Sequence, residues 1–512
     1  MLSTVKSLGL AGIDAFSVTI ETGLHRGIPS VDIVGLADKA VKESRDRVRM
    51  LFYNRQYPFP DGKVLINLVP ADVRKSGSIY DLPIAVSLLC AQGFLPQPPE
   101  HAVFLGELSI TGALVRAVGV LPMLLGAARQ GIKRAFIPFD NAAEGAIVQG
   151  MEVYPVKTID QLVQFLRGQD SLLLAGSVEP ADVKLPNAAP PLDLREVRGQ
   201  SAAKRALEIA AAGGHHLLMI GSPGTGKTML AKRLPSILPP LSEEESLDVT
   251  RIYSVCDKLP VGGALLTERP FRAPHHSISA AGLCGGGSIP VPGEISLAHN
   301  GVLFLDELPE FQRPALEALR QPLESGEITL SRAQGSLTFP SRFMLAAAMN
   351  PCPCGYFGSS SRACTCTPQK AAAYLNKISG PLLDRMDLQV EVNPIGFETL
   401  STANTEESSA QVRQRVCAAR AVQAARYQRL HIACNAQLPS SVLEEACPMS
   451  ENARLRFGQI FDKLGFSGRT YDRILKVART IADLAASETI HSAHILEAVQ
   501  YRSLDRKYWN HS

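Results

Sequence analysis

The first third of the chain alternates between short β-like apolar runs and longer stretches in which apolar residues recur at helical spacing. Strands that alternate with helices are typical of a sheet covered by helices, so residues 1–170 are predicted to form an α/β domain. The expected strands lie at 16–20, 64–68, 103–105 and 134–137, and the expected helices at 39–51, 82–91 and 121–129.

The pattern changes twice further along. Residues 171–191 collect prolines among small and polar residues, which predicts a semi-extended linker. Residues 192–395 again alternate strands with helices and are predicted to be a second α/β core. Residues 396–512 have helical periodicity and almost no strand signal, which predicts a helical lid. Its expected helices lie at 409–428, 450–464, 469–486 and 492–501.

Composition narrows the class of protein. A chain of 512 residues is too long for one small binding module, and 46% hydrophobic with 20% charged residues is ordinary for a globular protein. A net charge of +3 excludes the strong basic excess of a protein that simply coats nucleic acid. We find no apolar run near the roughly 18 residues of a membrane span and no secretory signal in residues 1–13, so we expect a cytoplasmic protein with no membrane partner.

A phosphate-binding loop opens the second core. A short apolar run at 216–220 leads directly into Gly-Ser-Pro-Gly-Thr-Gly-Lys-Thr and then into a helical run, which fits the GxxxxGK[ST] motif in its strand-loop-helix context. Lys227 is predicted to reach the β- and γ-phosphates of ATP, and Thr228 to ligate Mg²⁺. The predicted ATP-binding residues are Gly221, Ser222, Pro223, Gly224, Thr225, Gly226, Lys227 and Thr228.

Two later strands end in residues suited to hydrolysis. A buried run from Gly301 ends in Asp306 and Glu307, and a second run at 343–349 ends in Asn350. Asp306 is predicted to hold the Mg²⁺ shell, and Glu307 to polarise the attacking water. Asn350 is predicted to orient that water by hydrogen bonding, although an asparagine also suits a plain turn.

Several contiguous motifs around these strands resemble AAA+ ATPases of the magnesium-chelatase-related branch, and in particular the ComM (YifB) competence protein family. They lie at 269–276, 285–288, 292–299, 301–310, 319–324 and 349–355. The resemblance covers essentially the whole chain. It implies a homo-oligomeric ring, expected to be a hexamer, that hydrolyses ATP between subunits and moves single-stranded or branched DNA.

The resemblance also implies roles for residues outside the strands. The segment 380–387 resembles the one that carries the arginine finger, so Arg385 would reach a neighbour's ATP, whereas an isolated arginine is usually a surface ion pair. The segment 467–473 resembles the start of the sensor 2 helix, with Arg469 as the expected γ-phosphate contact and Arg473 as the competing choice. Gly199 and Gln200 resemble the segment that packs on adenine; the alternative is a simple loop.

Two inserts are implied by the same resemblance. Residues 282–299 resemble the helix 2 insert and 327–340 the pre-sensor hairpin, which line the pore in ring-shaped relatives. Arg332 at the hairpin tip is the predicted DNA contact, and the alternative is a solvated turn. His275 and His276 either support the insert or cap a helix, and the sequence does not separate these roles.

The N-terminal domain resembles the Lon-protease-like fold, through the segments 106–113, 126–133 and 137–141. A working Lon site needs a serine nucleophile and a lysine that activates it. The stretch 118–123, where the lysine should fall, has none, and the serine stretch reads Lys-Ser-Gly-Ser-Ile-Tyr-Asp at 75–81. We therefore predict no peptidase activity.

Four of the ten cysteines form two close pairs, Cys352-Pro-Cys354 and Cys364-Thr-Cys366. Four thiolates are able to close a tetrahedral structural Zn²⁺ site. The one-residue spacing within each pair is tighter than usual, so free thiols in a loop stay open as the alternative.

Three functions follow from these features. The leading hypothesis is an ATP-dependent DNA translocase or helicase. The family resemblance implies that its task would be branch migration when transforming DNA is integrated by homologous recombination. The alternatives are a magnesium-chelatase-type motor that acts on a protein–porphyrin partner, and a peptidase or remodelling ATPase. A basic stretch at 411–430 favours DNA, unless its arginines pair with acids on a neighbouring element.

Overall fold

The computed structural model describes residues 2–177, 192–260, 263, 265–287, 290–332, 335–358, 362–396, 406–430 and 432–509. It divides into two compact units, Met1–Ala188 with Glu243–Leu266, and Ala189–Ser242 with Thr267–Ser512. The segment 243–266 therefore folds with the N-terminal unit, although it interrupts the second unit in sequence. Nothing in the periodicity of residues 192–395 indicates this excursion.

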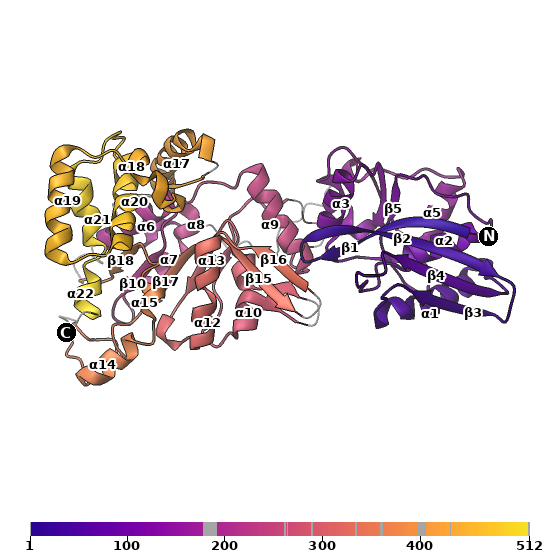
Figure 1. Ribbon diagram of the computed structural model, residues 1–512, viewed down its shortest axis with the longest axis horizontal. Helices are drawn as coiled ribbons and strands as arrows, with labels where there is room; N and C mark the ends of the chain where they lie inside the picture. Colours follow the sequence, from indigo (N-terminus) through magenta and orange to yellow (C-terminus); the bar gives the residue numbers. More distant parts are fainter. Residues whose placement is uncertain are drawn as a thin grey trace. The chain divides into compact units, whose positions relative to one another are not determined.

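A seven-stranded mixed sheet forms the centre of the first unit, in the order β3-β4-β2-β1-β5-β8-β9. Its strands β1 to β5 are labelled in Figure 1. The first two strands make a long antiparallel hairpin, whereas β5, β8 and β9 run parallel. The strands are β1 Leu2–Ala11, β2 Asp14–His25, β3 Ser30–Val34, β4 Lys63–Val69, β5 Ala102–Phe104, β8 Arg134–Pro138 and β9 Glu152–Val156, with a small ladder of β6 Glu107–Leu108 and β7 Leu114–Val115. The predicted α/β class is confirmed, whereas β1, β3 and β9 were not predicted.

Helices from distant parts of the sequence cover this sheet. They are α1 Lys39–Arg55, α2 Asp81–Ala91, α3 Val120–Arg129, α4 Ala142–Ala146, α5 Ile159–Leu166 and α9 Glu243–Val255. All residues of α2 are buried, which agrees with its largely apolar sequence. The buried Ser254 at the end of α9 donates to Glu144 Oε2 at 2.6 Å, and its carbonyl accepts from Gly119 N at 3.2 Å. These contacts anchor the excursion within the first unit.

The second unit contains a five-stranded parallel sheet in the order β11-β14-β17-β10-β18. Its strands are β10 Leu217–Ile220, β11 Phe271–Arg272, β14 Val302–Leu305, β17 Met344–Met349 and β18 Leu388–Glu391. Every residue of β10, β14 and β17 is buried, as expected for parallel strands covered on both faces. The carboxyl ends of these strands meet at one edge of the sheet.

Short elements surround the parallel sheet. The insert region contains α10 Ala280–Cys284, β12 Gly285–Gly286, β13 Val291–Pro292 and α11 Glu294–Leu297, and the hairpin pairs β15 Glu327–Arg332 with β16 Gly335–Pro340. The other helices are α6 Ser201–Gly213, α7 Lys227–Lys232, α8 Leu234–Ile237, α12 Arg313–Ala318, α13 Arg320–Ser325, α14 Pro368–Leu375 and α15 Gly380–Leu383.

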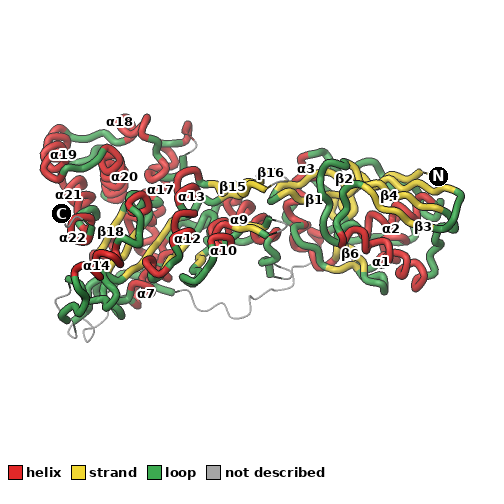
Figure 2. The backbone as a smooth tube through the Cα atoms, turned by 60° about the horizontal axis from the view of Figure 1, so that its bottom comes forward, coloured by secondary structure: helices red, strands yellow, loops and turns green. Residues whose placement is uncertain are grey.

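The C-terminal part is helical, as predicted, and its helices gather at one end of the unit (Figure 2). They are α17 Ser409–Arg426, α18 Leu443–Ala446, α19 Glu451–Leu464, α20 Gly468–Leu484, α21 Ser492–Gln500 and α22 Leu504–Tyr508. Among the helices of the described residues, none combines the length and the apolar character needed to cross a membrane.

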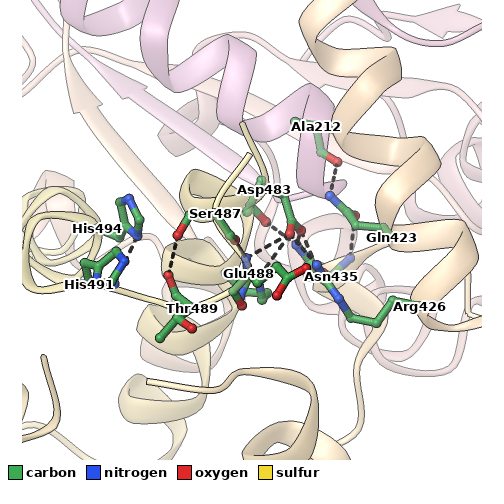
Figure 3. Close-up of polar contacts among 12 residues, drawn as sticks. Ala212, Gln423, Arg426, Asn435, Asp483, Ser487, Glu488, Thr489, His491 and His494 are labelled. Atoms are coloured by element: carbon green, nitrogen blue, oxygen red, sulfur yellow. Dashed lines mark hydrogen bonds and ion pairs between the residues drawn. The ribbon is translucent and has the colours of Figure 1, made fainter. Parts of the chain in front are cut away.

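A buried polar network ties the C-terminal helices to each other and to α6 (Figure 3). Arg426 pairs with the buried carboxylate of Asp483 at 2.6 Å, and Asn435 Nδ2 donates to the same carboxylate at 2.8 Å. Gln423 donates to the carbonyl of Ala212 at 3.1 Å. Because a buried carboxylate is costly unless paired, Arg426 serves the core of this unit. Arg415 likewise pairs with Glu208. Some arginines of the basic stretch at 411–430 therefore form ion pairs within this unit.

Candidate ATPase site

The predicted phosphate loop has the geometry that its sequence requires. It connects the end of β10 to α7, and Gly224 and Gly226 have φ values of 77° and 94°, which favour glycine. A Cβ on Gly221 would lie 2.2 Å from the carbonyl oxygen of Val392, so no larger residue fits between the loop and the end of β18. Thr225 Oγ1 donates to the Ser222 carbonyl at 2.9 Å and holds the loop closed.

The ammonium of Lys227 lies at the centre of this loop. Its Nζ donates to the carbonyls of Gly221 at 2.7 Å and Ser222 at 2.9 Å, and to Asn350 Oδ1 at 3.1 Å. Burial lowers the pKa of Lys227, and the charges of Asp306 and Glu307 oppose that effect. The predicted site residues therefore lie close together at the phosphate loop: Lys227, Asp306, Glu307 and Asn350.

Oxygen ligands suited to Mg²⁺ lie beside the lysine. Thr228 Oγ1 donates to Asp306 Oδ2 at 2.5 Å, and the backbone N–H of Glu307 donates to Asp306 Oδ1 at 2.9 Å. Hydroxyl and carboxylate oxygens are the protein ligands that Mg²⁺ uses in nucleotide sites. The residues present thus fit ATP with Mg²⁺, which would supply charge neutralisation at the phosphates.

Strand order explains why Asn350 reaches the loop. β17 lies between β14 and β10, and Met349 is in register with Ile220. Residues one position beyond each strand are therefore adjacent, which sets Asn350 beside Gly221.

The segment of Gly199 and Gln200 also contacts the loop. Gln200 Nε2 donates to the carbonyls of Thr225 at 3.2 Å and Asn393 at 2.7 Å, while Gly199 N donates to Glu406 Oε1 at 2.6 Å. Sequence reasoning gave no signal for Glu406, because the contact joins residues more than 200 positions apart.

Comparison with known proteins agrees with this geometry. Residues 193–400 match the family described as magnesium chelatase, subunit ChlI; residues 20–141 match subunit ChlI of Mg-chelatase, and residues 406–502 its C-terminal region. The chain is 44% identical over 508 residues to the competence protein ComM of Haemophilus influenzae, covering 99% of this chain and 98% of that protein. The YifB protein of Escherichia coli is 44% identical over 510 residues, covering 99% and 98%.

The chain belongs to the ComM/YifB family. Its magnesium-chelatase-type AAA domain implies ATPase activity with ATP and Mg²⁺. A shorter similarity, 28% identity over 153 residues, relates this ComM homologue to Lon protease 2 of Bacillus subtilis, covering 28% of this chain and 27% of that protein.

Arg385, the first of the two arginines predicted for this ComM homologue, makes its contacts outside the phosphate loop. Arg385 pairs with Glu324 and donates to the carbonyl of Pro381. Burial lowers the pKa of Arg385, and the nearby charges of Arg320, Arg473 and Arg469 lower it further. Within the described residues, neither Arg385 nor Arg469 bonds to the phosphate loop. The sequence did not indicate Glu324 as the partner of Arg385.

Arg469 and Arg473 differ in their surroundings. Arg469 lies exposed in the first turn of α20, whereas the side chain of Arg473 is largely buried and its Nε lies 3.8 Å from Asp387 Oδ1. The exposed position leaves Arg469 available to an incoming phosphate.

The cysteine loop brings the two predicted pairs together. The four Sγ atoms of Cys352, Cys354, Cys364 and Cys366 all lie within 4.8 Å of one another. Three of the separations are 3.3, 3.7 and 3.5 Å. Tetrahedral Zn–S bonds of about 2.3 Å require thiolates about 3.8 Å apart, so the donor set fits Zn²⁺. Backbone N–H groups of Phe357 and Cys366 also point at the sulfurs of Cys352 and Cys364, at 3.3 and 3.4 Å.

The DNA-contact prediction falls at the edge of the described chain. Arg332 is the last residue of β15 and is in register with Gly335, but its side chain lies outside the described residues.

Within residues 2–177, the side chain of Lys75 forms no hydrogen bond with either nearby serine. Lys75 is fully buried with no hydrogen-bond partner for Nζ, while Ser78 bonds to Glu107. In the stretch expected to carry the activating lysine, Val120, Leu121 and Met123 are packed in the core.

Proposed function

We propose that this chain is a ring-forming DNA translocase that hydrolyses ATP between subunits and promotes branch migration when transforming DNA is integrated by homologous recombination. The observation that supports the proposal is where these residues make their contacts. Hydrogen bonds join the phosphate loop to Asn350 and Asp306, whereas Arg385 pairs with Glu324 and, among the described residues, neither Arg385 nor Arg469 bonds to that loop. An arginine that completes a neighbour's site couples hydrolysis to assembly.

Each site residue would have a separate role in ATP hydrolysis. Lys227 and Thr228 with Asp306 would hold the γ-phosphate and Mg²⁺, and Glu307 would take the proton of a water oriented by Asn350. Arg385 and Arg469 of the adjacent subunit would neutralise the charge that develops on the transferred phosphoryl group. Six copies would arrange the insert and the Arg332 hairpin around a pore able to track a DNA backbone without reading its sequence.

Support for a DNA substrate comes from the relatives. The full-length relative in Haemophilus influenzae is named a competence protein, and competence is the uptake of DNA. The test is a labelled four-way DNA junction incubated with the full chain, Mg²⁺ and ATP, with strand separation followed on a gel. Wild-type protein should separate the strands, and Glu307→Gln should bind the junction without separating it. Hydrolysis of ATP by wild type with no action on any DNA structure would contradict the proposal.

A magnesium-chelatase-type motor is the second candidate, because three regions of the chain match ChlI families. The two candidate functions are distinguished by which partner stimulates the ATPase. Branched or single-stranded DNA should raise the rate of a translocase, whereas a porphyrin-bearing protein partner should raise that of a chelatase motor.

We also propose that the cysteine loop is a structural Zn²⁺ site. Four sulfurs within 4.8 Å of one another, two of which receive backbone N–H bonds, support a closed site with no open position for substrate.

A further inference from the structure

The first residues of the C-terminal helical region are bonded to the segment that leads into α6. Gly199 N donates to Glu406 Oε1 at 2.6 Å, and Lys204 Nζ donates to Glu406 Oε2 at 2.5 Å. Further on, Ser409 N donates to Asp193 Oδ1 at 2.9 Å. The start of the helical region is therefore attached at two points, and in one of them Glu406 uses both of its carboxylate oxygens.

The segment that Glu406 contacts has an uncommon backbone conformation. Gly199 and Gln200 have φ values of 60° and 58°, so two successive residues are left-handed, and the second of them carries a Cβ. Gln200 is also the N-cap of α6, but its side chain makes no capping bond to that helix. Left-handed residues other than glycine persist where surrounding contacts hold them. The bond from Gly199 N to Glu406 is such a contact.

The side-chain amide of Gln200 is bonded to the phosphate loop instead. Its Nε2 donates to the carbonyls of Thr225 at 3.2 Å and Asn393 at 2.7 Å. The carbonyl of Thr225 and the N–H of Gly226 belong to one planar peptide unit and point in opposite directions. Backbone N–H groups of a loop of this type bind the phosphates of the nucleotide. A bond to the Thr225 carbonyl therefore fixes the direction of one of these N–H groups.

We propose that Glu406 is a positioning residue for ATP binding. Its bond to Gly199 keeps Gln200 left-handed, and the Gln200 amide in turn holds the carbonyl of Thr225 in the phosphate loop. The inference rests on the ATP-binding part of the proposed function and not on the DNA part. Because Glu406 precedes α17, the same contacts connect the C-terminal helical region to the nucleotide site.

The test measures nucleotide affinity in variants of the full chain, by titration with fluorescent N-methylanthraniloyl-ATP and Mg²⁺, and kcat by phosphate release at saturating ATP. Glu406→Ala should raise the Kd about tenfold while kcat stays within about twofold, because the groups proposed for the chemical step stay in place. Glu406→Gln keeps an oxygen that accepts the Gly199 N–H, so its Kd should stay within about threefold of wild type. Glu407→Ala is the matched control and should keep the wild-type Kd, since Glu407 pairs with Arg415 of α17.

Gln200→Ala tests whether Glu406 acts through the neighbouring amide. Alone, it should raise the Kd by about the same factor as Glu406→Ala, because it removes the next bond toward the phosphate loop. Adding Glu406→Ala to Gln200→Ala should then raise the Kd less than about twofold further, since the two residues act through one contact. Factors that multiply in the double variant overturn the proposal, and so does a wild-type Kd in Gln200→Ala.

Lys227→Ala separates the two possible failures. Should wild type and Lys227→Ala bind the nucleotide equally, the phosphate-loop assignment fails and the role of Glu406 fails with it. Loss of binding in Lys227→Ala beside a wild-type Kd in Glu406→Ala overturns only the role of Glu406. Equal rises in Kd for Glu406→Ala and Glu406→Gln, or a fall in kcat as large as the rise in Kd, also overturn that role. Because no DNA is present, failure of the translocase proposal leaves these outcomes unaffected.

Discussion

The hydroxyl of Thr228 donates to the carboxylate of Asp306 across 2.5 Å, joining the first turn of α7 to the tip of β14. The two residues are 78 positions apart in the sequence. They are neighbours in space because the strands that precede them belong to one parallel sheet. This pair supplies the oxygen ligands expected for Mg²⁺.

Thr228→Ala should raise the Mg²⁺ concentration needed for half-maximal ATPase about tenfold or more, because one oxygen ligand is lost. Thr228→Ser keeps the hydroxyl and should stay close to wild type. A Mg²⁺ titration of the ATPase rate at saturating ATP measures both. Identical titration curves for the alanine and serine variants would contradict the ligand role.

Asn350→Ala should lower kcat about tenfold to a hundredfold while leaving ATP affinity within about threefold, because the amide is proposed to orient the water and Lys227 keeps its carbonyl partners. Asn350→Asp accepts from Lys227 but has no N–H to donate, so it should be as slow as the alanine variant. Nucleotide binding is measured by fluorescent-nucleotide titration and kcat by phosphate release. An Asn350→Asp variant with wild-type kcat would limit the residue to holding Lys227.

Arg385 should act on a neighbouring subunit. Arg385→Ala and Lys227→Ala should each abolish most ATPase activity alone, the first for lack of the finger and the second for lack of phosphate binding. A mixture of the two variants should regain activity, because an intact phosphate loop then meets an intact Arg385 from its neighbour. The readout is phosphate release across mixing ratios. No recovery, in a mixture shown by light scattering to form joint oligomers, would place the finger within its own subunit.

Cys352→Ser should lose bound zinc and weaken ATP binding. The four-cysteine loop reaches the phosphate loop, since a Cβ on Gly355 would lie 2.4 Å from Pro223 Cδ. A loosened cysteine loop would therefore disturb the phosphate site. Zinc content is measured by mass spectrometry of the purified protein. Cys417→Ser, outside the cluster, is the control and should match wild type in zinc and ATP affinity. Zinc-free wild-type protein with full ATP affinity would contradict both the metal and its coupling.

Two histidines, the buried His299 and the partly buried His216, should make the second unit less stable in mild acid. Burial lowers the pKa of His216 to about 4 and that of His299 to about 4. Each Nδ1 accepts a backbone N–H, from Leu345 at 3.1 Å and from Arg342 at 3.0 Å, which favours the neutral ring. The unfolded chain takes up protons near pH 6.5, so stability is fully present above that pH and is lost as pH falls toward 4.

His299→Asn should reduce the pH dependence of the free energy of unfolding, because the amide oxygen accepts the same N–H without titrating. The reduction should be at most about 1.4 kcal/mol per pH unit, which is the slope for one proton. Urea unfolding between pH 4 and 7 measures this free energy. The unfolding is monitored by the fluorescence of the single tryptophan, Trp509, which packs against the core of this unit. An unchanged pH slope in His299→Asn would exclude that histidine as a source of the loss of stability in acid.

The sequence by itself determined the elements and residues whose signals are local. The phosphate loop, the strand ending in Asp306 and Glu307, and the helical C-terminal region are each set by neighbouring residues, because glycine placement and apolar periodicity act over a few positions. The close spacing within each cysteine pair likewise predicted a cluster, and the structure brings the two pairs together.

Only the tertiary structure decided which of these residues meet. Beyond the paired strands β11 and β14, His276 Nδ1 lies 3.2 Å from Glu307 Oε2. Arg385 pairs with Glu324, 61 positions away. The return of α9 to the N-terminal unit is accompanied by a buried hydrogen bond from Ser254 to Glu144. Such contacts depend on strand order and on burial shared by distant segments. The periodicity of a single segment does not indicate which other segment it packs against.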